Sequence, residues 1–484
     1  MAVSYTKLEL YIDGQWISGG GRACEPVLDP ATEEVLGMLP LAGTADLDHA
    51  LAAAERALPA WSALPAYQRG RILKKAADLI RERLESIAAV LTREQGKSIR
   101  ESRIEVALTA DIFEWMAEEG RRAYGRIIPS RDPDLHWSVF KEPVGVVAAF
   151  SPWNFPGTTP SRKMAGPLAA GCCCILKASE ETPGTAIELT RALHDAGLPA
   201  GVFNLVFGVP AEVSQYLIAS PIVRKVTFTG STAVGKHLAA LSAQGLKSLT
   251  MELGGHAPVI VFDDVDVERV VRLAVGSKFR NAGQVCVSPS RIFVHERIMS
   301  RFAERFASLA ADLRVGSGLD EGNAMGPLAN PRRLQAMETY LDDAAACGAR
   351  VLAGGSRRAG KGYFWEPTVL ADIPPDARLL HEEPFGPVAS LIPFGGESEV
   401  LARSNSLAYG LASYVFTSDL DRATRVSHAL HAGLVGINTF TLSGPETPWG
   451  GVGDSGYGRE GGIEGLEGYM HVKTVSQATP FKPV

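Results

Sequence analysis

One cysteine of this chain stands in surroundings that suit a nucleophile. Cys286 follows a polar turn that contains Gly283 and Gln284, at the end of a predicted helix and between apolar segments typical of a core. A thiol attacks only as the thiolate, so a reactive cysteine needs access together with a helix terminus or polar neighbours. Free cysteines are also among the most buried residues, and this stretch alone favours a structural cysteine. The rest of the chain has to decide between the two.

A carboxylate and an amide stand where such a nucleophile could use them. Glu252 ends an apolar segment and is followed by Gly254 and Gly255. Partial burial there would raise its pKa and suit a general base, although a salt-bridged structural glutamate is also open. Asn154 lies between two prolines in the loop 152–156, and its amide could donate to a developing oxyanion. Asparagine in such a loop can equally be a turn former.

The stretch 230–237 almost matches the phosphate loop of nucleoside-triphosphate-binding proteins. It has the Gly-x-x-x-x-Gly-Lys spacing, but His237 stands where a Ser or Thr hydroxyl should bind Mg²⁺. The features common to phosphate sites in general are still present. Gly230 and Ser231 follow a predicted strand and open a helix whose N-terminus favours a phosphate. A tight turn that needs no ligand is the alternative.

Two charged residues follow another predicted strand directly. Lys177 and Glu180 stand at the carboxyl end of the strand 172–176. An acidic residue in that place can accept hydrogen bonds from a ribose diol and would repel a 2′-phosphate, which favours NAD over NADP. A solvated loop explains the same two residues.

The elements that would position these residues form two α/β alternations. Residues 8–17 alternate around Asp13 and Gly14 and predict a hairpin, and residues 44–120 have a helical period expected of scaffold helices. Strands then alternate with helices, which predicts a parallel sheet covered on both faces, with ligands at the strands' carboxyl ends. The predicted strands of this first alternation are 144–150, 172–176, 202–206, 226–229 and 248–252.

Within the first alternation, the helix 183–196 has clear end signals. Thr182 is placed as its N-cap, Pro183 as its first residue and Gly197 just beyond its end. A second alternation covers residues 258–438 and predicts a second α/β unit, and residues 469–476 read as a final strand.

Composition excludes several classes of protein. A chain of 484 residues with 46% hydrophobic residues predicts two or three globular domains. A net charge of −6 without any cluster of Lys and Arg argues against nucleic acid, and no apolar run approaches the roughly 18 residues of a membrane span. We find no secretory signal and expect a cytoplasmic protein. The six cysteines show neither a disulfide framework nor a metal-ligand spacing.

Taken in order, the motifs of this chain resemble those of the aldehyde dehydrogenase superfamily over nearly its whole length. Glu-Leu-Gly-Gly at 252–255 and Gly-Gln-x-Cys at 283–286 are highly specific as a pair. Pro-Trp-Gly-Gly stands at 448–451, where Pro-Phe-Gly-Gly is usual. The remaining matches are Pro-Trp-Asn-Phe-Pro at 152–156, Lys-x-x-Glu at 177–180, Phe-Thr-Gly-Ser at 228–231 and Glu-Glu-Pro-Phe-Gly-Pro at 382–387.

This resemblance implies a covalent mechanism that needs no metal. Cys286 would attack the aldehyde to give a thiohemiacetal, with Asn154 and the backbone N–H of Cys286 as the oxyanion hole. Hydride transfer to a nicotinamide would leave a thioester, and Glu252 would activate the water that hydrolyses it. The residues that match the family's cofactor contacts are Trp153, Lys177, Glu180, Gly230, Ser231, Glu383 and Phe385. NAD is the expected cofactor, and NADP is the second choice.

The resemblance also implies a Rossmann-like parallel-sheet cofactor domain, an α/β catalytic domain and a small β flap that joins subunits into a homodimer or homotetramer. The cofactor domain would comprise residues 1–122 and 143–254, the catalytic domain 255–455, and the flap 123–142 with 469–484.

Within the superfamily, the chain looks most like the succinate-semialdehyde and 2-oxoglutarate-semialdehyde dehydrogenases. Arg162 and Arg280 fall where that branch binds a substrate carboxylate, with Ser443 as a third contact. Arg280 could instead form only a salt bridge at a helix end. Some relatives carry a redox-active cysteine where this chain has Ser288, so no disulfide switch is expected. The alternatives are a dehydrogenase of neutral or aromatic aldehydes, a nucleoside-triphosphate-binding protein and a non-catalytic relative.

Overall fold

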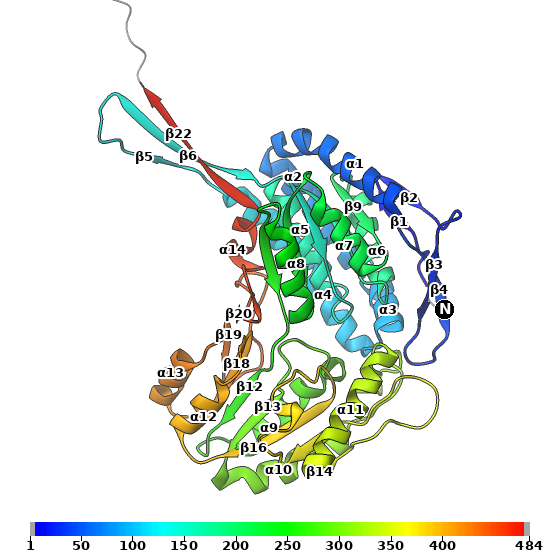
Figure 1. Ribbon diagram of the computed structural model, residues 1–484, viewed down its shortest axis with the longest axis vertical. Helices are drawn as coiled ribbons and strands as arrows, with labels where there is room; N and C mark the ends of the chain where they lie inside the picture. The colour runs from blue at the N-terminus through cyan, green and yellow to red at the C-terminus, as the bar shows by residue number, and fades with distance from the viewer. Residues whose placement is uncertain (1–4, 479–484) are drawn as a thin grey trace, which may run out of the picture.

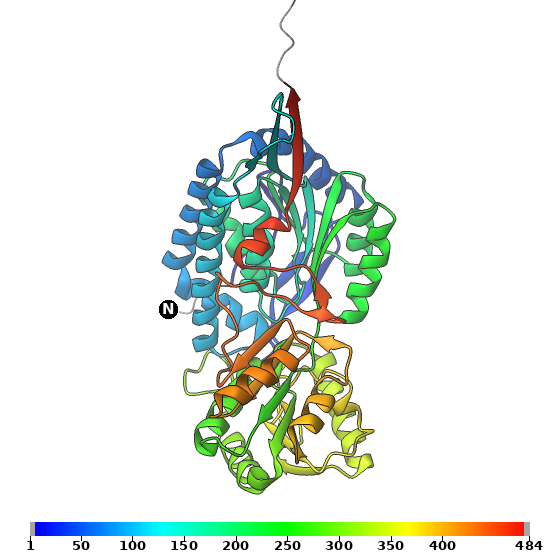
Figure 2. The same cartoon turned by 90° about the vertical axis from the view of Figure 1, so that its left-hand side faces the viewer.

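The computed structural model describes residues 5–478, which build two large sheets and a narrow projecting ribbon (Figure 1). The two sheets lie one above the other, each covered by helices, and the ribbon leaves the upper one as an arm (Figures 1 and 2). Of the helices within residues 5–478, none has the length and the apolar content that a bilayer crossing requires.

The first sheet has eight strands, and five parallel strands form its centre in the order β9, β8, β7, β10, β11. Both edges are antiparallel, because the hairpin β1–β2 adds at one side and the two-residue strand β21 at the other. The predicted parallel sheet is therefore correct for the centre, and short edge strands complete it. The bounds are β1 Leu10–Ile12, β2 Gln15–Ile17, β7 Val146–Phe150, β8 Cys173–Lys177, β9 Phe203–Val206, β10 Val223–Thr229, β11 Ser248–Glu252 and β21 Gly456–Tyr457.

Helices cover both faces of this sheet. Helices α1, α7 and α8 contact one face, while α5 packs on the other with α2, α3, α4 and α6 around it. The strands supply the core between these layers, since every residue of β7, β8 and β9 is buried. The bounds are α1 Thr44–Ala63, α2 Ala66–Glu82, α3 Leu84–Gln95, α4 Ile99–Glu119, α5 Thr158–Ala170, α6 Pro183–Asp195, α7 Pro210–Ala219 and α8 Thr232–Ala243.

Helix α6 begins as predicted, but a distant carboxylate caps it. Thr182 occupies the N-cap position, yet its hydroxyl makes no capping bond. The buried Glu94 instead accepts hydrogen bonds from the backbone N–H groups of Gly184 and Thr185, at 2.7 and 2.8 Å. The carboxylate can satisfy both donors at once, which a threonine hydroxyl cannot do.

The second sheet has seven strands in the order β14-β15-β16-β13-β12-β18-β19, all parallel except the edge strand β14. It confirms the α/β character of the second alternation. Its strands are β12 Pro258–Val261, β13 Arg291–His295, β14 Arg350–Ala353, β15 Thr368–Ala371, β16 Val388–Phe394, β18 Ala412–Phe416 and β19 Leu434–Ile437. Its helices are α9 Val267–Phe279, α10 Glu296–Ala311, α11 Pro331–Cys347, α12 Glu397–Ser404 and α13 Leu420–Ala429.

The ribbon consists of β5 Arg126–Ile128, β6 Leu135–Pro143 and β22 Met470–Ala478. Strand β22 pairs with β6 along its full length, and the pair projects beyond the first sheet (Figure 1). Ile127 and Val472 are exposed on it. These strands lie in the two segments predicted as a flap, of which residues 479–484 lie outside the described residues. The predicted domain boundaries stay a prediction.

Candidate active site

The nucleophile candidate sits after a left-handed turn that joins α9 to the segment of Cys286. Asn281, Ala282 and Gly283 all have positive φ, at 49°, 52° and 70°. Two of them are not glycine, and such conformations cost about 1–3 kcal/mol each unless the surroundings hold them. At Gly283 a side chain has no room, because a Cβ would lie 2.1 Å from the carbonyl oxygen of Gly386.

Asn154 is part of what holds this turn. Its Nδ2 donates to the carbonyl of Gln284 at 3.1 Å, and its own carbonyl accepts from Nδ2 of Asn281 at 2.9 Å. The side chain of Gln284 closes the turn by donating to the Asn281 carbonyl at 3.0 Å. Asn154 therefore lies beside the nucleophile segment as predicted, and its second amide hydrogen is available to another acceptor.

A buried ion pair, which the sequence interpretation missed, positions the loop of Asn154. Lys97 Nζ lies 2.6 Å from Glu105 Oε2, donates to the Asn154 carbonyl at 2.8 Å and stands 3.9 Å from the centre of the Phe155 ring. The other oxygen of Glu105 accepts from the N–H of Gly157 at 2.8 Å. Both side chains come from the segment assigned to scaffold helices. Only their burial in three dimensions shows their role, since a lysine at a helix start gives no sequence signal.

Glu252 ends β11 as predicted, and its carboxyl group is buried without a partner. Neither carboxylate oxygen has a hydrogen-bond partner among residues 5–478. Burial raises its pKa well above the ordinary value, the charge of Glu460 adds to this, and Lys163 and Arg162 oppose it. Glu460 itself is paired, because Lys163 Nζ lies 2.5 Å from its Oε1. An unpartnered carboxyl with a raised pKa is suited to accept and release a proton.

The thiol of Cys286 is half-buried and resists ionisation. Burial is the main reason that its pKa is raised to about 12; the charges of Glu383 and Glu252 also raise the pKa, whereas Arg280 lowers it. The resting group is therefore the neutral thiol, and its deprotonation needs an acceptor and a nearby positive charge.

Two arginines flank the nucleophile without carboxylate partners. Arg162, on α5, stands 5.4 Å from the Trp449 ring, and its buried Nη1 has no hydrogen-bond partner in the described chain. Burial lowers its pKa, and Cys286 and Glu252 are among the groups whose charge it feels. Arg280 is exposed, lies 5.6 Å from the Phe155 ring and forms no ion pair within residues 5–478. The described structure thus does not show the helix-end salt bridge that was the alternative for Arg280.

A cavity of about 320 Å³ opens between Arg280 and the two valines that flank Cys286. Tyr414 and Thr441 also line it. Ser443 follows two residues later and is half-buried, and no hydrogen bond among the described residues joins it to either arginine. The cavity can hold a small organic molecule, with the cations Arg272 and Arg280 on its wall. The neighbours of Cys286 line it, whereas Cys286 itself and Arg162 do not.

The adenosine-side candidates meet at the carboxyl ends of the central strands of the first sheet. Lys177 and Glu180 form an ion pair just after β8, and Glu180 accepts from the N–H of Gly208 at 3.3 Å. Gly230 directly follows β10, and Ser231 is the N-cap of α8, whose first turn receives no capping hydrogen bond from a side chain. These residues fit a dinucleotide, with the ribose at the carboxylate and the pyrophosphate at the helix N-terminus.

The structure does not favour the phosphate-loop alternative, because the lysine of that motif forms an ion pair with another residue. Lys236 extends to Asp454, at 2.7 Å between Nζ and Oδ2. A phosphate-binding lysine has to reach the β- and γ-phosphates instead.

The nicotinamide-side candidates lie on the second sheet's side, close to Cys286. Burial raises the pKa of Glu383 to about 8, and its carboxyl is packed so closely on Gly254 that a Cβ there would lie 2.5 Å from Oε2. The rings of Trp153 and Phe385 stand edge to face, with centroids 5.6 Å apart. The predicted cofactor residues therefore run from the end of β8 to the nucleophile, as a dinucleotide requires.

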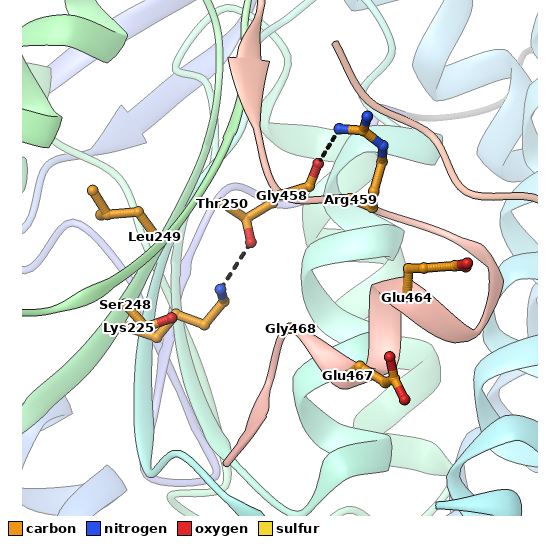
Figure 3. Close-up of a pocket in the computed structure, with 9 residues that line it drawn as sticks. All are labelled: Lys225, Ser248, Leu249, Thr250, Gly458, Arg459, Glu464, Glu467 and Gly468. Atoms are coloured by element: carbon orange, nitrogen blue, oxygen red, sulfur yellow. Dashed lines mark hydrogen bonds between the residues drawn. The ribbon is translucent and has the colours of Figure 1, made fainter. Parts of the chain in front are cut away.

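A second cavity, of about 350 Å³, holds none of the predicted site residues (Figure 3). Lys225 donates to the Thr250 hydroxyl at 2.8 Å, and Arg459 donates to the Gly458 carbonyl at 2.6 Å. Burial lowers the pKa of Lys225 to about 8. Glu467 on its wall pairs with Lys141 at 2.7 Å. Because several of its polar groups are already partnered, this cavity is a less suitable reaction site than the surroundings of Cys286.

Comparison with known proteins shows which protein family this chain matches. Residues 16–475 match the family model described as "Aldehyde dehydrogenase family". The chain is 49% identical to the 4-(hydroxymethyl)benzenesulfonate dehydrogenase TsaD1 of Comamonas testosteroni, over 97% of this chain and 98% of that protein. It is 43% identical to the NADP(+) succinate-semialdehyde dehydrogenase GabD of Escherichia coli K12, over 96% of both. The crystal structure of succinate-semialdehyde dehydrogenase from Burkholderia pseudomallei superposes with a TM-score of 0.96, at 42% identity and 98% coverage of both chains.

Replacing Lys97 tests the buried pair. Lys97→Met should lower the midpoint of thermal unfolding, because an uncompensated Glu105 costs about 3–5 kcal/mol. The double variant Lys97→Met/Glu105→Gln should recover most of that midpoint, since glutamine still accepts from Gly157 without a buried charge. Equal midpoints for the wild type and Lys97→Met would contradict a role for the pair.

The ionisation of Cys286 can be measured through its reactivity. Because burial raises its pKa to about 12, the thiolate fraction should grow about tenfold per pH unit between pH 7 and 9. The rate of alkylation by iodoacetamide, followed by mass spectrometry of the peptide that contains Cys286, should rise in the same way without a plateau. Arg280→Gln should slow alkylation at every pH. A plateau below pH 8 would show that the folded protein stabilises the thiolate.

Proposed function

The chain belongs to the aldehyde dehydrogenase family, and from this premise we propose that it oxidises aldehydes with a distal anionic group to carboxylates, with NAD as cofactor. The observation that carries the substrate class is the pair Arg162 and Arg280 beside Cys286, neither of which has a carboxylate partner in the described chain. Both arginines are close enough to Cys286 to interact with its charge, and two such cations are costly unless an anion completes them.

The residues present fit a nicotinamide dinucleotide. Lys177 and Glu180 would hold the adenosine ribose, Ser231 the pyrophosphate, and Glu383 with Phe385 the nicotinamide ribose. When bound, the nicotinamide supplies the acceptor for the hydride that leaves the substrate carbon. The carboxylate of Glu180 favours NAD, because it would repel the 2′-phosphate of NADP. The relative GabD carries NADP(+) in its name, so both cofactors belong in every assay.

The first covalent step belongs to Cys286. Its sulfur attacks the aldehyde carbon, the C–S bond forms, and the carbonyl electron pair moves onto oxygen. The thiol proton passes to the carboxylate of Glu252, whose oxygens are unpartnered. Because the pKa of Glu252 is raised, it lies closer to the pKa of the thiol than an ordinary carboxyl pKa does. The free amide hydrogen of Asn154 and the backbone N–H of Cys286 would stabilise the oxyanion. One such donor contributes about 2.7–4 kcal/mol.

Glu252 acts again in the second step. Once the substrate is oxidised, a thioester remains on Cys286 and has to be hydrolysed. Glu252 first releases the thiol proton to solvent and then, as the carboxylate, takes a proton from water as the water oxygen attacks the acyl carbon. The C–S bond breaks, the sulfur regains a proton, and the carboxylate product leaves.

The anion on the substrate can be a carboxylate or a sulfonate. Succinic and 2-oxoglutaric semialdehydes are the first candidates, since the chain is 43% identical to a succinate-semialdehyde dehydrogenase. Sulfonated aromatic aldehydes are the second candidate, because a relative 49% identical is named for a benzenesulfonate. Aromatic rings near both arginines, Phe155 and Trp449, favour a flat substrate in that case.

The ribbon supports a proposal of homo-oligomer formation. Its exposed apolar residues Ile127 and Val472 stand on an arm that projects beyond the first sheet (Figure 1). A second copy of the chain would cover them, as a homodimer or a homotetramer.

Two single variants test the covalent steps. Cys286→Ala should abolish NADH formation, because no group remains to form the hemiacetal. Glu252→Gln should slow turnover by about 10²–10⁴-fold, because the thiol and the hydrolytic water both lose their proton acceptor. NADH formation by Cys286→Ala at the wild-type rate would exclude the proposed chemistry.

A substrate panel tests the two arginines. Arg162→Ala and Arg280→Ala should each raise KM for succinic semialdehyde and 4-sulfobenzaldehyde about 10- to 100-fold, since a charged hydrogen bond contributes about 1.5–3 kcal/mol. KM for propanal and benzaldehyde should change less than about threefold. Arg→Lys variants are the matched controls for charge without the planar fork. Losses of equal size on charged and neutral aldehydes would remove the anion site, and the anionic substrate with the highest kcat/KM, with NAD or NADP, identifies the preferred pair.

A further inference from the structure

One face of helix α11 supports the loop that carries two of the proposed cofactor contacts. Arg333, Met337 and Tyr340 are spaced four and three residues apart, so they lie on one side of the helix. The loop 382–386, which contains Glu383 and Phe385, lies against all three.

Arg333 binds the middle of this loop through its backbone. Its Nη2 donates to the carbonyls of Pro384 and Phe385, the latter at 3.2 Å. The guanidinium also stands 5.8 Å from the centre of the Phe385 ring. A planar guanidinium can bind two carbonyls and face a ring at the same time, which an ammonium cannot do.

The other two residues hold the ends of the loop. The hydroxyl of Tyr340 donates to the carboxylate of Glu382 at 3.2 Å and to the carbonyl of Glu383 at 3.4 Å. Met337 packs so closely on Gly386 that a Cβ there would lie 2.3 Å from its sulfur. The helix therefore contacts every residue of the loop from 382 to 386.

The loop needs this support, because Phe385 has a φ of +45°. A bulky side chain rarely adopts the left-handed region, and it persists there only when its surroundings impose it. The two hydrogen bonds from Arg333 fix the carbonyls on both sides of this residue.

The surroundings of Arg333 lower the stability of the fold, so stability alone does not explain why an arginine stands there. It forms no ion pair within the described residues, and its Nε is buried without a hydrogen-bond partner there. Burial lowers its pKa accordingly. Arg333 is half-buried. A cation that loses solvent without gaining a carboxylate partner destabilises a fold, so a role in positioning explains its presence better than a role in packing.

The same turn of α11 reaches the other parts of the site. The N–H of Ala329 donates to Oε1 of Gln284, in the nucleophile segment, at 2.9 Å. Asn330 donates to Glu181, which is adjacent to Glu180, also at 2.9 Å. The start of α11 therefore ties the loop 382–386 to the nucleophile segment and to the adenosine side.

We propose that Arg333 is a positioning residue for the cofactor: it holds Phe385 in its left-handed conformation, so that Glu383 and Phe385 are in place before the nicotinamide ribose arrives. This inference rests on the proposed use of a nicotinamide dinucleotide. Without the two hydrogen bonds, Phe385 is free to relax toward an extended conformation and the loop has to be ordered during binding, which weakens binding of the cofactor and not of the aldehyde.

The experiment measures NAD binding by isothermal titration calorimetry without any aldehyde. Arg333→Gln should raise the Kd for NAD about tenfold, since two hydrogen bonds are lost. Arg333→Lys should recover only part of this, because one ammonium cannot bind both carbonyls and face the ring. Thr339→Ala, on the exposed side of the same helix, should leave the Kd within about twofold. At saturating NAD, KM for the aldehyde should stay within about twofold in all three variants.

A folded Arg333→Gln variant with an unchanged Kd for NAD would overturn the proposal. Full recovery by Arg333→Lys would also overturn it, because charge alone would then suffice. If Arg333→Gln does not fold, Tyr340→Phe removes only the hydroxyl at the other end of the loop and should raise the Kd about threefold. An unchanged Kd in that variant counts against the proposal. A wild type that binds NAD but oxidises no aldehyde would refute the proposed function and leave this test intact.

Discussion

The site depends on the hydrogen bonds between the loop after β7 and the left-handed turn after α9. Asn154 and Asn281 exchange bonds with backbone carbonyls across the boundary between the two sheets. Neither segment holds its conformation alone, because the turn is strained and the loop has no regular structure. Joined, they place the amide of Asn154 beside the segment of Cys286, with Arg280 on the wall of an adjacent cavity. The buried pair Lys97–Glu105 fixes the loop's side of this junction.

Three charged side chains around this junction have no partner in the described chain. Glu252 and Arg162 leave buried polar atoms without a hydrogen bond there, and Arg280 has no carboxylate. Elsewhere, buried charges such as Glu94 and Arg291 have several hydrogen-bond partners. Unmet hydrogen-bonding capacity is costly, so these three charged groups near one thiol mark a place where a ligand and water complete the structure.

Local patterns in the sequence predicted much of this arrangement. The strands that end at Lys177 and Glu252 were readable, because buried parallel strands form short apolar runs and polar residues follow them. Features that depend on distant partners were not readable. Strand β21 pairs with β11 across some two hundred residues, and Glu94 replaces Thr182 as the cap of α6. Lys97 lies just before α4 and Arg333 lies in an ordinary helical pattern, and only the packing of other elements gives them their roles.

The end of the chain completes structures that its beginning starts. Strand β21, at residues 456–457, adds the last strand to the first sheet, and β22 pairs with β6 over nine residues. During synthesis the amino-terminal half therefore has no complete sheet edge and no ribbon until nearly the whole chain has left the ribosome. The edge of β11 and the strand β6 wait unpaired for that time, exposed to other chains and to chaperones. Formation of the pairs β11–β21 and β6–β22 is therefore the step that completes both the first sheet and the ribbon.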